Sequence, residues 1–302
     1  MRVIFLGTPD FAIPSLEALV RDHTIVLVVA QPDKPAGRGM KLTPPPVAVR
    51  AKEFGFELSQ PMKVRDELFL KRVEAMQPDI GIVVAYGKIL PKALLEIPRY
   101  GFVNVHGSIL PKYRGAAPIQ RAIEAGETTT GVTIMRVDEE LDHGPMFAIE
   151  TTAIGPEERA PSVARGLAAL GGELLAGVLR EIANGTARET PQDHARATYA
   201  PKVEKREGLV TFSESPMNIY NRFRAFDPWP GVFFESDGET IRIVEMERED
   251  VSAPPREIVA ISNDGVVLDG LRLVTLQRPG KQRTSAAAVA RALGWQVGAP
   301  IP

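Results

Sequence analysis

The sequence of 302 residues contains no cysteine. Disulfide bonds, thiolate nucleophiles and cysteine metal sites are therefore excluded, and the composition suits a reducing compartment. The first residues run directly into an apolar strand pattern from Arg2 to Leu6, and we identify no window that approaches the length of a membrane span. We therefore expect a soluble protein of the cytoplasm.

The chain also lacks an excess of charge of either sign. Its 36 Lys and Arg residues oppose 38 Asp and Glu residues, which gives a formal net charge of -2. Broad coating of nucleic acid is not expected, because nonspecific phosphate binding depends on clustered basic side chains. Any contact with nucleic acid must be local. The length and the hydrophobic share of 44% are those of two ordinary globular domains.

A third feature that is lacking is the glycine triplet of dinucleotide-binding folds. The first apolar run is followed by Gly-Thr-Pro-Asp-Phe at 7–11, which has only one glycine. Without the other glycines, pyrophosphate cannot approach the start of the following helix. NAD and FAD are therefore not expected, and Gly7 is interpreted as a structural corner.

The first half of the chain alternates short apolar runs with helical patterns. This alternation predicts an α/β domain of Rossmann-like type over residues 1–184, with a mostly parallel sheet covered by helices. The predicted strands are 2–6, 24–30, 79–85, 101–106 and 131–137, and the clearest helices are 10–20 and 158–183.

The second half has a different pattern. Residues 185–204 are polar and aperiodic, which predicts a linker. Residues 205–302 show short strands at close spacing with Asp-Gly turns, and helices near 215–225 and 284–292. This pattern favours a small five-stranded OB-like β-barrel, although a compact sandwich would give a similar one. The predicted strands are 231–235, 240–246, 257–261, 265–268 and 271–276.

Polar residues gather at the ends of two predicted strands. Asn104 and His106 are two positions apart, so that their side chains share one face of a strand. Ligands of parallel sheets bind at such strand ends. Asp142 lies in a turn after another strand, from which its carboxylate can reach a neighbouring loop. By spacing alone, all three residues would more often have turn and packing roles than catalytic ones.

The string NVHGSILPKYRGAAPIQRAI at 104–123, followed by GETTTGVTIM and LDHGPM, resembles the folate-dependent formyltransferases. The resemblance implies that Asn104, His106 and Asp142 form the active site of a catalytic domain over 1–184. It also implies 10-formyltetrahydrofolate as the formyl donor, held by Ser108, Ile109, Leu110 and Pro111, and no metal. His143 is less expected in this pattern. We interpret it as an exposed neighbour, and competition for the Asp142 carboxylate is the alternative.

The resemblance extends to family members that formylate initiator methionyl-tRNA for translation initiation. The strings that carry it are GTPDFA at 7–12, QPDKPAGRG at 31–39, VVAYGKILPK at 83–92 and RAFDPWPG at 224–231. It implies that residues 205–302 bind tRNA. Transfer to an amino sugar or a purine precursor is the first alternative. An RNA-binding module with a degenerate enzyme domain is the second.

A basic segment lies between the second and third predicted strands. From Lys34 to Lys52 it has five basic residues and no acidic one, and its Pro and Gly content predicts an irregular loop. Such a loop can lie along a phosphate backbone, or it can simply be solvated. By resemblance it contacts the acceptor end of the tRNA through Arg38, Lys34 and Lys41.

Formyl transfer to an amine makes three chemical demands. The negatively charged oxygen of the tetrahedral intermediate needs hydrogen-bond donors, which we expect to be Asn104 and His106. The attacking amine must lose a proton, and we expect Asp142 to accept it or to strengthen the imidazole as a donor. The carrier must be oriented, which the resemblance assigns to 108–111.

Overall fold

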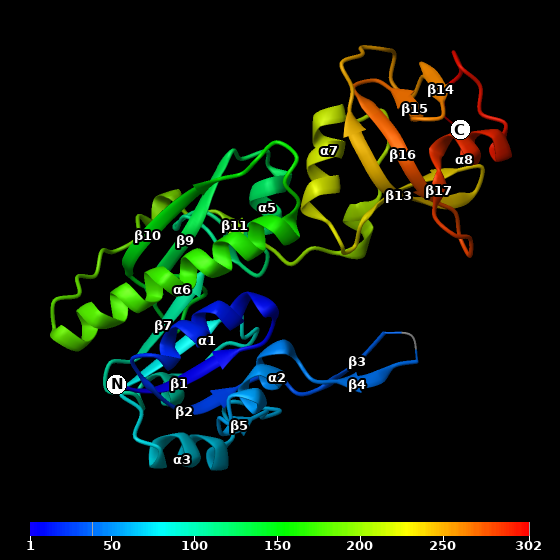
Figure 1. Cartoon of the computed structure of the whole chain (residues 1–302). Helices are drawn as coiled ribbons and strands as arrows, with labels where there is room; N and C mark the ends of the chain where they lie inside the picture. The colour runs from blue at the N-terminus through cyan, green and yellow to red at the C-terminus, as the bar shows by residue number, and fades with distance from the viewer. Residues whose placement is uncertain (38, 302) are drawn as a thin grey trace. The chain divides into compact units, whose positions relative to one another are not determined.

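The computed structural model describes residues 1–37 and 39–301, which form two compact units (Figure 1). The first unit comprises Met1–Pro118, Thr129–Ala153 and Val163–Pro201, and the second comprises Ile119–Thr128, Ile154–Ser162 and Lys202–Pro302. The predicted boundaries at 184 and 205 remain predictions. The segment 185–204 contains a 3-10 turn, η2 (His194–Arg196), and a short strand, β11 (Tyr199–Ala200), that pairs with β8 (Arg114–Gly115).

The first unit is built on a seven-stranded sheet of order β10-β9-β7-β6-β1-β2-β5. Five strands run parallel, and β9 and β10 pair in antiparallel fashion at one edge. The predicted mixed α/β class is confirmed. The strands are β1 (Arg2–Gly7), β2 (Thr24–Val29), β5 (Leu58–Ser59), β6 (Ile80–Val84), β7 (Phe102–His106), β9 (Thr129–Arg136) and β10 (Met146–Ala153).

The central strands form because they are apolar over their whole length and can be buried on both faces. Val3 to Leu6 of β1 are 0 to 1% exposed. On β6, Gly81 leaves room for the ring of Phe102 on β7, since a Cβ there would lie 2.2 Å from a ring carbon. Helices flank these strands: η1 (Asp10–Ala12), α1 (Ile13–Val20), α2 (Pro46–Glu53), α3 (Glu67–Ala75), α4 (Lys92–Leu95) and α6 (Ala160–Asn184). Helix α5 (Pro118–Glu124) belongs, except for Pro118, to the second unit.

Helix α6 corrects one expectation from the sequence. Its 25 residues are long and apolar enough to cross a membrane, by length and composition alone. Leu167, Leu175 and Leu179 on it are fully buried, and Gly171 packs against Val105 of β7 and Val132 of β9. The apolar surface of α6 is therefore that of a core helix in a soluble domain.

The basic segment contains regular structure where we expected none. β3 (Lys34–Ala36) and β4 (Lys41–Thr43) form an antiparallel hairpin, which Figure 1 shows projecting from the sheet. Pro35 is compatible with the hairpin because a two-stranded ribbon has only one bonded side for each strand. Pro46 stands at the first turn of α2, where a missing N–H costs nothing. The prediction of an irregular loop was wrong.

The second unit is an antiparallel β domain, as predicted. Its sheet has the order β12-β13-β16-β15-β14, with β17 beside β16, and the described residues show no pairing between β12 and β14. Its core includes Phe234, Ile241, Leu273 and Trp295. The elements are η3 (Lys205–Gly208), α7 (Pro216–Ala225), β12 (Val232–Ser236), β13 (Glu239–Arg248), β14 (Ala260–Ser262), β15 (Gly265–Leu268), β16 (Leu271–Gln277), β17 (Thr284–Ser285) and α8 (Ala286–Leu293).

Candidate active site

Strand β7 and the loop between β9 and β10 bring Asn104, His106 and Asp142 together. On β7, Val105 packs toward α6, so that Asn104 and His106 face the other side of the sheet. The turn after β9 then returns Asp142 to them. Asn104 Nδ2 donates to Asp142 Oδ1 at 3.3 Å, and His106 Nδ1 lies 3.6 Å from Asp142 Oδ2. Two residues on one strand thus share one carboxylate that is distant in sequence.

The Asp142 carboxylate is mostly enclosed. Its side chain is 13% exposed, and that of His106 is 6% exposed. The Gly115 amide donates to Asp142 Oδ2 at 2.8 Å. Each carboxylate oxygen therefore accepts one hydrogen bond and retains a lone pair, which leaves capacity to accept a further proton or donor.

The imidazole of His106 is fixed by a backbone carbonyl. His106 Nε2 lies 2.9 Å from Tyr113 O, and because a carbonyl only accepts, Nε2 must carry the hydrogen. The ring atom that faces Asp142 is then Nδ1. We expected the amide and the imidazole to converge on an open point, but in this structure both are directed at the carboxylate. Within this cluster, the second hydrogen of Asn104 Nδ2 has no hydrogen-bond acceptor among the described residues.

The four residues predicted to hold the folate lie in the loop after β7. Ser108 is fully buried and its hydroxyl donates to Lys112 O at 2.7 Å. Leu110 is 2% exposed, and its amide donates to Thr133 Oγ1 at 3.1 Å. Ile109 and Pro111 are partly exposed. Ser108 and Leu110 thus shape the loop, while Ile109 and Pro111 present surface.

The residues predicted to contact tRNA belong to the basic segment that forms the β3–β4 hairpin. Lys34 pairs with Thr43 and Lys41 with Ala36 in the strand register, and both lysines are exposed. Arg38 lies outside the described residues.

The loop after β6 is a feature to which the sequence analysis gave no role. The Tyr86 carbonyl accepts from Thr8 Oγ1 at 3.1 Å and from Gln31 Nε2 at 3.0 Å, so it joins the loops that follow β1, β6 and β2. The chain order reverses between β1 and β6, which is where open α/β sheets bind ligands. The sequence contains one indication of this loop, the string VVAYGKILPK at 83–92, which supported the family resemblance but contains no residue to which a chemical role was assigned.

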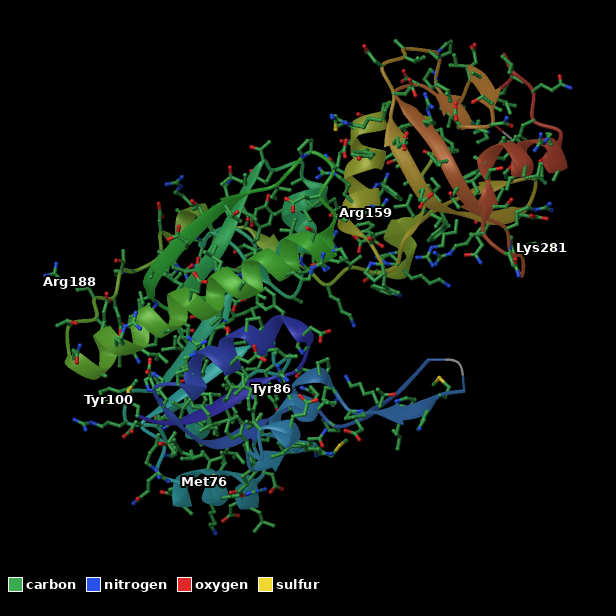
Figure 2. All side chains as sticks on the ribbon, viewed as in Figure 1. Met76, Tyr86, Tyr100, Arg159, Arg188 and Lys281 are labelled. Atoms are coloured by element: carbon green, nitrogen blue, oxygen red, sulfur yellow. The ribbon has the colours of Figure 1, made fainter. Side chains whose placement is uncertain are left out.

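Two side chains of this loop have shifted pKa values. Burial raises the pKa of the Tyr86 phenol to about 12, and the ring lies inside the first unit (Figure 2). Burial and then the charge of Lys34 lower the pKa of Lys88, whose Nζ donates to Pro61 O and Met62 O at 3.0 and 2.8 Å. A hollow of about 340 Å³ adjoins it, lined by Met62, Lys63, Val64, Arg65, Lys88, Ile89 and Pro91.

His143 is bound to neighbours other than Asp142. Its Nδ1 lies 2.8 Å from Asp138 Oδ2, its ring stacks on His194 at 4.1 Å, and its side chain is 31% exposed. The structure thus shows a half-buried residue that leaves the Asp142 carboxylate to the other contacts. Within 1–37 and 39–301, no three His, Asp or Glu side chains gather as a metal site would require.

Comparisons with known proteins match nearly the whole chain. A family described as "Formyl transferase" matches residues 1–179, and "Formyl transferase, C-terminal domain" matches 202–294. The chain is 42% identical over 291 residues to a methionyl-tRNA formyltransferase of Geobacter metallireducens, covering 95% of this chain and 94% of that one. It is 44% identical to a methionyl-tRNA formyltransferase of Thermus thermophilus, with 97% of each covered.

Two solved structures share the fold at low identity. HypX from Aquifex aeolicus in complex with tetrahydrofolic acid has a TM-score of 0.63 and 19% identity, over 98% of this chain and 48% of that one. The sugar 3N-formyl transferase WlaRD, in the presence of dTDP and 5-N-formyl-THF, has a TM-score of 0.67 and 15% identity, over 93% and 99%. With its identity to the relatives from Geobacter and Thermus, the chain belongs to the methionyl-tRNA formyltransferase family.

Proposed function

We propose that the chain transfers the formyl group of 10-formyltetrahydrofolate to the α-amine of initiator methionyl-tRNA. The observation that carries this proposal is the joining of Asn104, His106 and Asp142 in a partly enclosed cluster, in a chain similar over nearly its whole length to methionyl-tRNA formyltransferases. The reaction belongs to translation initiation, which assigns the enzyme to the cytoplasm.

The three residues divide the work of acyl transfer. The amine attacks the formyl carbon, a negatively charged oxygen develops, and the folate nitrogen leaves with the proton that Asp142 takes from the amine and passes on. Asn104 Nδ2 donates its second hydrogen to that oxygen, and the His106 ring, held by Tyr113 O, lies beside the Asp142 carboxylate and completes the polar wall of the site. Such a donor in an enclosed site is worth about 3 to 4 kcal/mol of barrier.

Asp142 takes the proton that the attacking amine loses. Its two oxygens retain lone pairs beside the bonds from Asn104 and Gly115, so the carboxylate can accept that proton directly or through a water. Positioned proton transfer contributes roughly a hundred- to ten-thousandfold to the rate.

Separate segments of the chain bind the two substrates. The loop 108–111 and the switch-point loop 85–91 hold the carrier, and the hollow with Lys63, Arg65 and Lys88 suits its anionic end. The basic segment with Lys34, Arg38 and Lys41 binds the acceptor end of the tRNA by its phosphates. Residues 205–302 bind the rest of the tRNA.

One assay separates this function from its alternatives. Purified protein is supplied with 10-formyltetrahydrofolate and either methionyl-tRNA, a uridine-diphosphate amino sugar or glycinamide ribonucleotide. We expect transfer to methionyl-tRNA alone. Transfer only to a small amine would overturn the tRNA assignment, and tRNA binding without any transfer would favour an RNA-binding module.

A further inference from the structure

A buried side-chain network lies behind the candidate active site, and its anchor is the short strand around β8. The Tyr113 carbonyl accepts a hydrogen bond from His106 Nε2, and the Gly115 amide donates one to Asp142 Oδ2. The side chain between them points to Gln192, since Arg114 Nε and Nη2 lie 3.1 and 2.7 Å from Gln192 Oε1. The segment 113–115 therefore contacts the candidate active site through its backbone and contacts Gln192 through the Arg114 side chain.

Gln192 connects this network to the loop that carries the carboxylate. Its Nε2 donates to Asp142 O at 2.9 Å and to Gly144 O at 2.8 Å. Gln192 is 4% exposed and Arg114 is 3% exposed, so neither bond competes freely with water. Removing such a buried donor leaves two carbonyls without a partner, which is costly.

The orientation of the Gln192 amide is defined by chemistry. A guanidinium has donors and no acceptor, so the atom that faces Arg114 must be the amide oxygen. The amide nitrogen then has to face the two carbonyls. His194 Nδ1 accepts a further bond from Arg114 Nη2 at 2.8 Å, which fixes the guanidinium from a second side.

The turn at 142–144, whose carbonyls accept hydrogen bonds from Gln192, has an uncommon backbone conformation. Asp142 has a φ of 48°, in the left-handed region that aspartate tolerates at some cost. In this conformation its side chain reaches Asn104, His106 and the Gly115 amide. Bonds to the carbonyls on both sides of His143 hold the turn in place.

We propose that Gln192 is a positioning residue for Asp142, with Arg114 setting the orientation of its amide. The proposal rests on the proposed function, because it matters for the rate only if Asp142 takes part in formyl transfer. Neither residue touches the reacting atoms. They act by keeping the carboxylate between Asn104, His106 and Gly115.

The test is Gln192→Glu, assayed at a temperature at which the variant is folded. The carboxylate keeps an oxygen for Arg114 and gains an ion pair, which offsets part of the cost of two carbonyls without a donor, so we expect a folded protein with a lower melting temperature than the wild type. It loses the two donated hydrogens and sets a negative oxygen against two carbonyls. We expect kcat to fall about ten- to a hundredfold, with KM for methionyl-tRNA and for the formyl donor within about twofold, as for a misplaced catalytic group.

A matched control is Gln77→Glu, just after α3 in the same unit. Gln77 is exposed, so the substitution adds the same charge without placing it against buried carbonyls. We expect its kcat to be unchanged. A similar fall in both variants would show a general effect of the added charge and would overturn the proposal.

A double-mutant cycle with Asp142→Asn gives the second readout, measured in single turnovers with excess enzyme. If Gln192 acts through Asp142, Gln192→Glu lowers the rate by less than about twofold in the Asp142→Asn background. Equal losses in both backgrounds would show a merely structural role, and would overturn the proposal.

Hydrogen exchange of the Gly115 amide tests the network without any activity. This amide donates to Asp142 Oδ2, so its exchange in Gln192→Glu should accelerate about tenfold or more while core amides of β1 keep their rates. Unchanged exchange together with full activity would refute the positioning role. Failure of the wild type to formylate methionyl-tRNA would instead contradict the proposed function, and the exchange experiment would still decide on the network.

Discussion

The cluster around Asp142 and the β3–β4 hairpin belong to the same unit and are built in opposite ways. The cluster is enclosed, with His106 and Asp142 side chains 6% and 13% exposed and held by bonds from several loops. The hairpin exposes Lys34 and Lys41, and the apolar residues Met40 and Leu42 are 69% and 63% exposed. Chemistry requires preorganised groups in a site with little water, whereas a phosphate backbone is met by accessible charges.

The difference separates two kinds of defect. A change in the cluster should slow the transfer step and leave tRNA affinity intact, because the cluster offers no broad charged surface. A change in the hairpin should weaken tRNA binding and leave the transfer step of bound substrate intact.

The largest effect is expected for Asp142→Asn. The amide cannot take a proton from the amine, so kcat should fall by roughly 10² to 10⁴ while KM for methionyl-tRNA changes by less than about twofold. Steady-state formylation assays measure both. Asp138→Asn is the matched control on the same loop, since Asp138 bonds only His143 and the Glu140 amide among the described residues. A control with an equally reduced rate would show that any charge change in this loop is harmful.

The next effect is a weaker affinity for tRNA when the hairpin charges are neutralised. Lys34→Ala, Arg38→Ala and Lys41→Ala combined should raise the dissociation constant of methionyl-tRNA about ten- to a hundredfold. The slope of the logarithm of affinity against the logarithm of salt concentration should become shallower by roughly 0.7 to 0.9 for each phosphate that is no longer neutralised. Filter binding over a range of salt concentrations measures both. Lys71→Ala on α3, an exposed lysine paired with Glu67, should change neither quantity.

A glycine substitution tests how tightly the cluster is enclosed. Gly115 has a φ of 119°, and a Cβ there would lie 2.8 Å from Ala200 O, so Gly115→Ala should cost about 1 to 3 kcal/mol of unfolding free energy. Gly177→Ala in α6 meets no atom within 4 Å and should instead stabilise the protein by up to about 1 kcal/mol. Denaturant titration of both variants measures the contrast, and equal values would contradict it.

The smallest effect lies outside both regions, at Glu207 in the second unit. Its hydrogen bonds from Arg121, at 2.7 and 3.0 Å, are the first cause that lowers the pKa of Glu207 from 4.5. A lowered pKa in the folded state stabilises the protein above pH 4.5, and this contribution disappears as the pH falls through the folded value. Glu207→Gln should cost roughly 0.2 to 1 kcal/mol at about pH 7 and almost nothing at a pH below the folded pKa of Glu207. Denaturant titrations at the two pH values measure the difference in unfolding free energy between the wild type and the variant. The same difference at both pH values would contradict this interpretation.

Much of the fold follows from local pattern. Strands β1, β2, β6, β7 and β9 were predictable because they are largely apolar and buried, as β1 shows. The edge strands β5 and β10 were missed, because β5 has only two residues and β10 is mostly exposed. The hairpin was missed because its Pro and Gly residues give no periodicity. The apolar length of α6 was underestimated, because its buried face is defined by the strands that it covers.

The site was predictable only in part. The shared face of Asn104 and His106 follows from strand geometry, but their link to Asp142 came from resemblance. The roles of all three remain predictions, and Asp142→Asn tests that of the carboxylate. Arg114 and Gln192 are 78 positions apart. The polar segment around Gln192 has no local pattern that predicts the burial of this glutamine against a distant arginine.

The division of labour between cluster and hairpin is tested most directly by two variants in one experiment. Single-turnover formylation rates with saturating enzyme, and dissociation constants for methionyl-tRNA, are measured for Asp142→Asn and for the hairpin triple variant. We predict a rate at least about a hundredfold lower with unchanged affinity for the first variant, and weakened affinity with a nearly normal rate for the second. The account would be contradicted if Asp142→Asn kept its rate, or if both variants showed reduced rate and reduced affinity together.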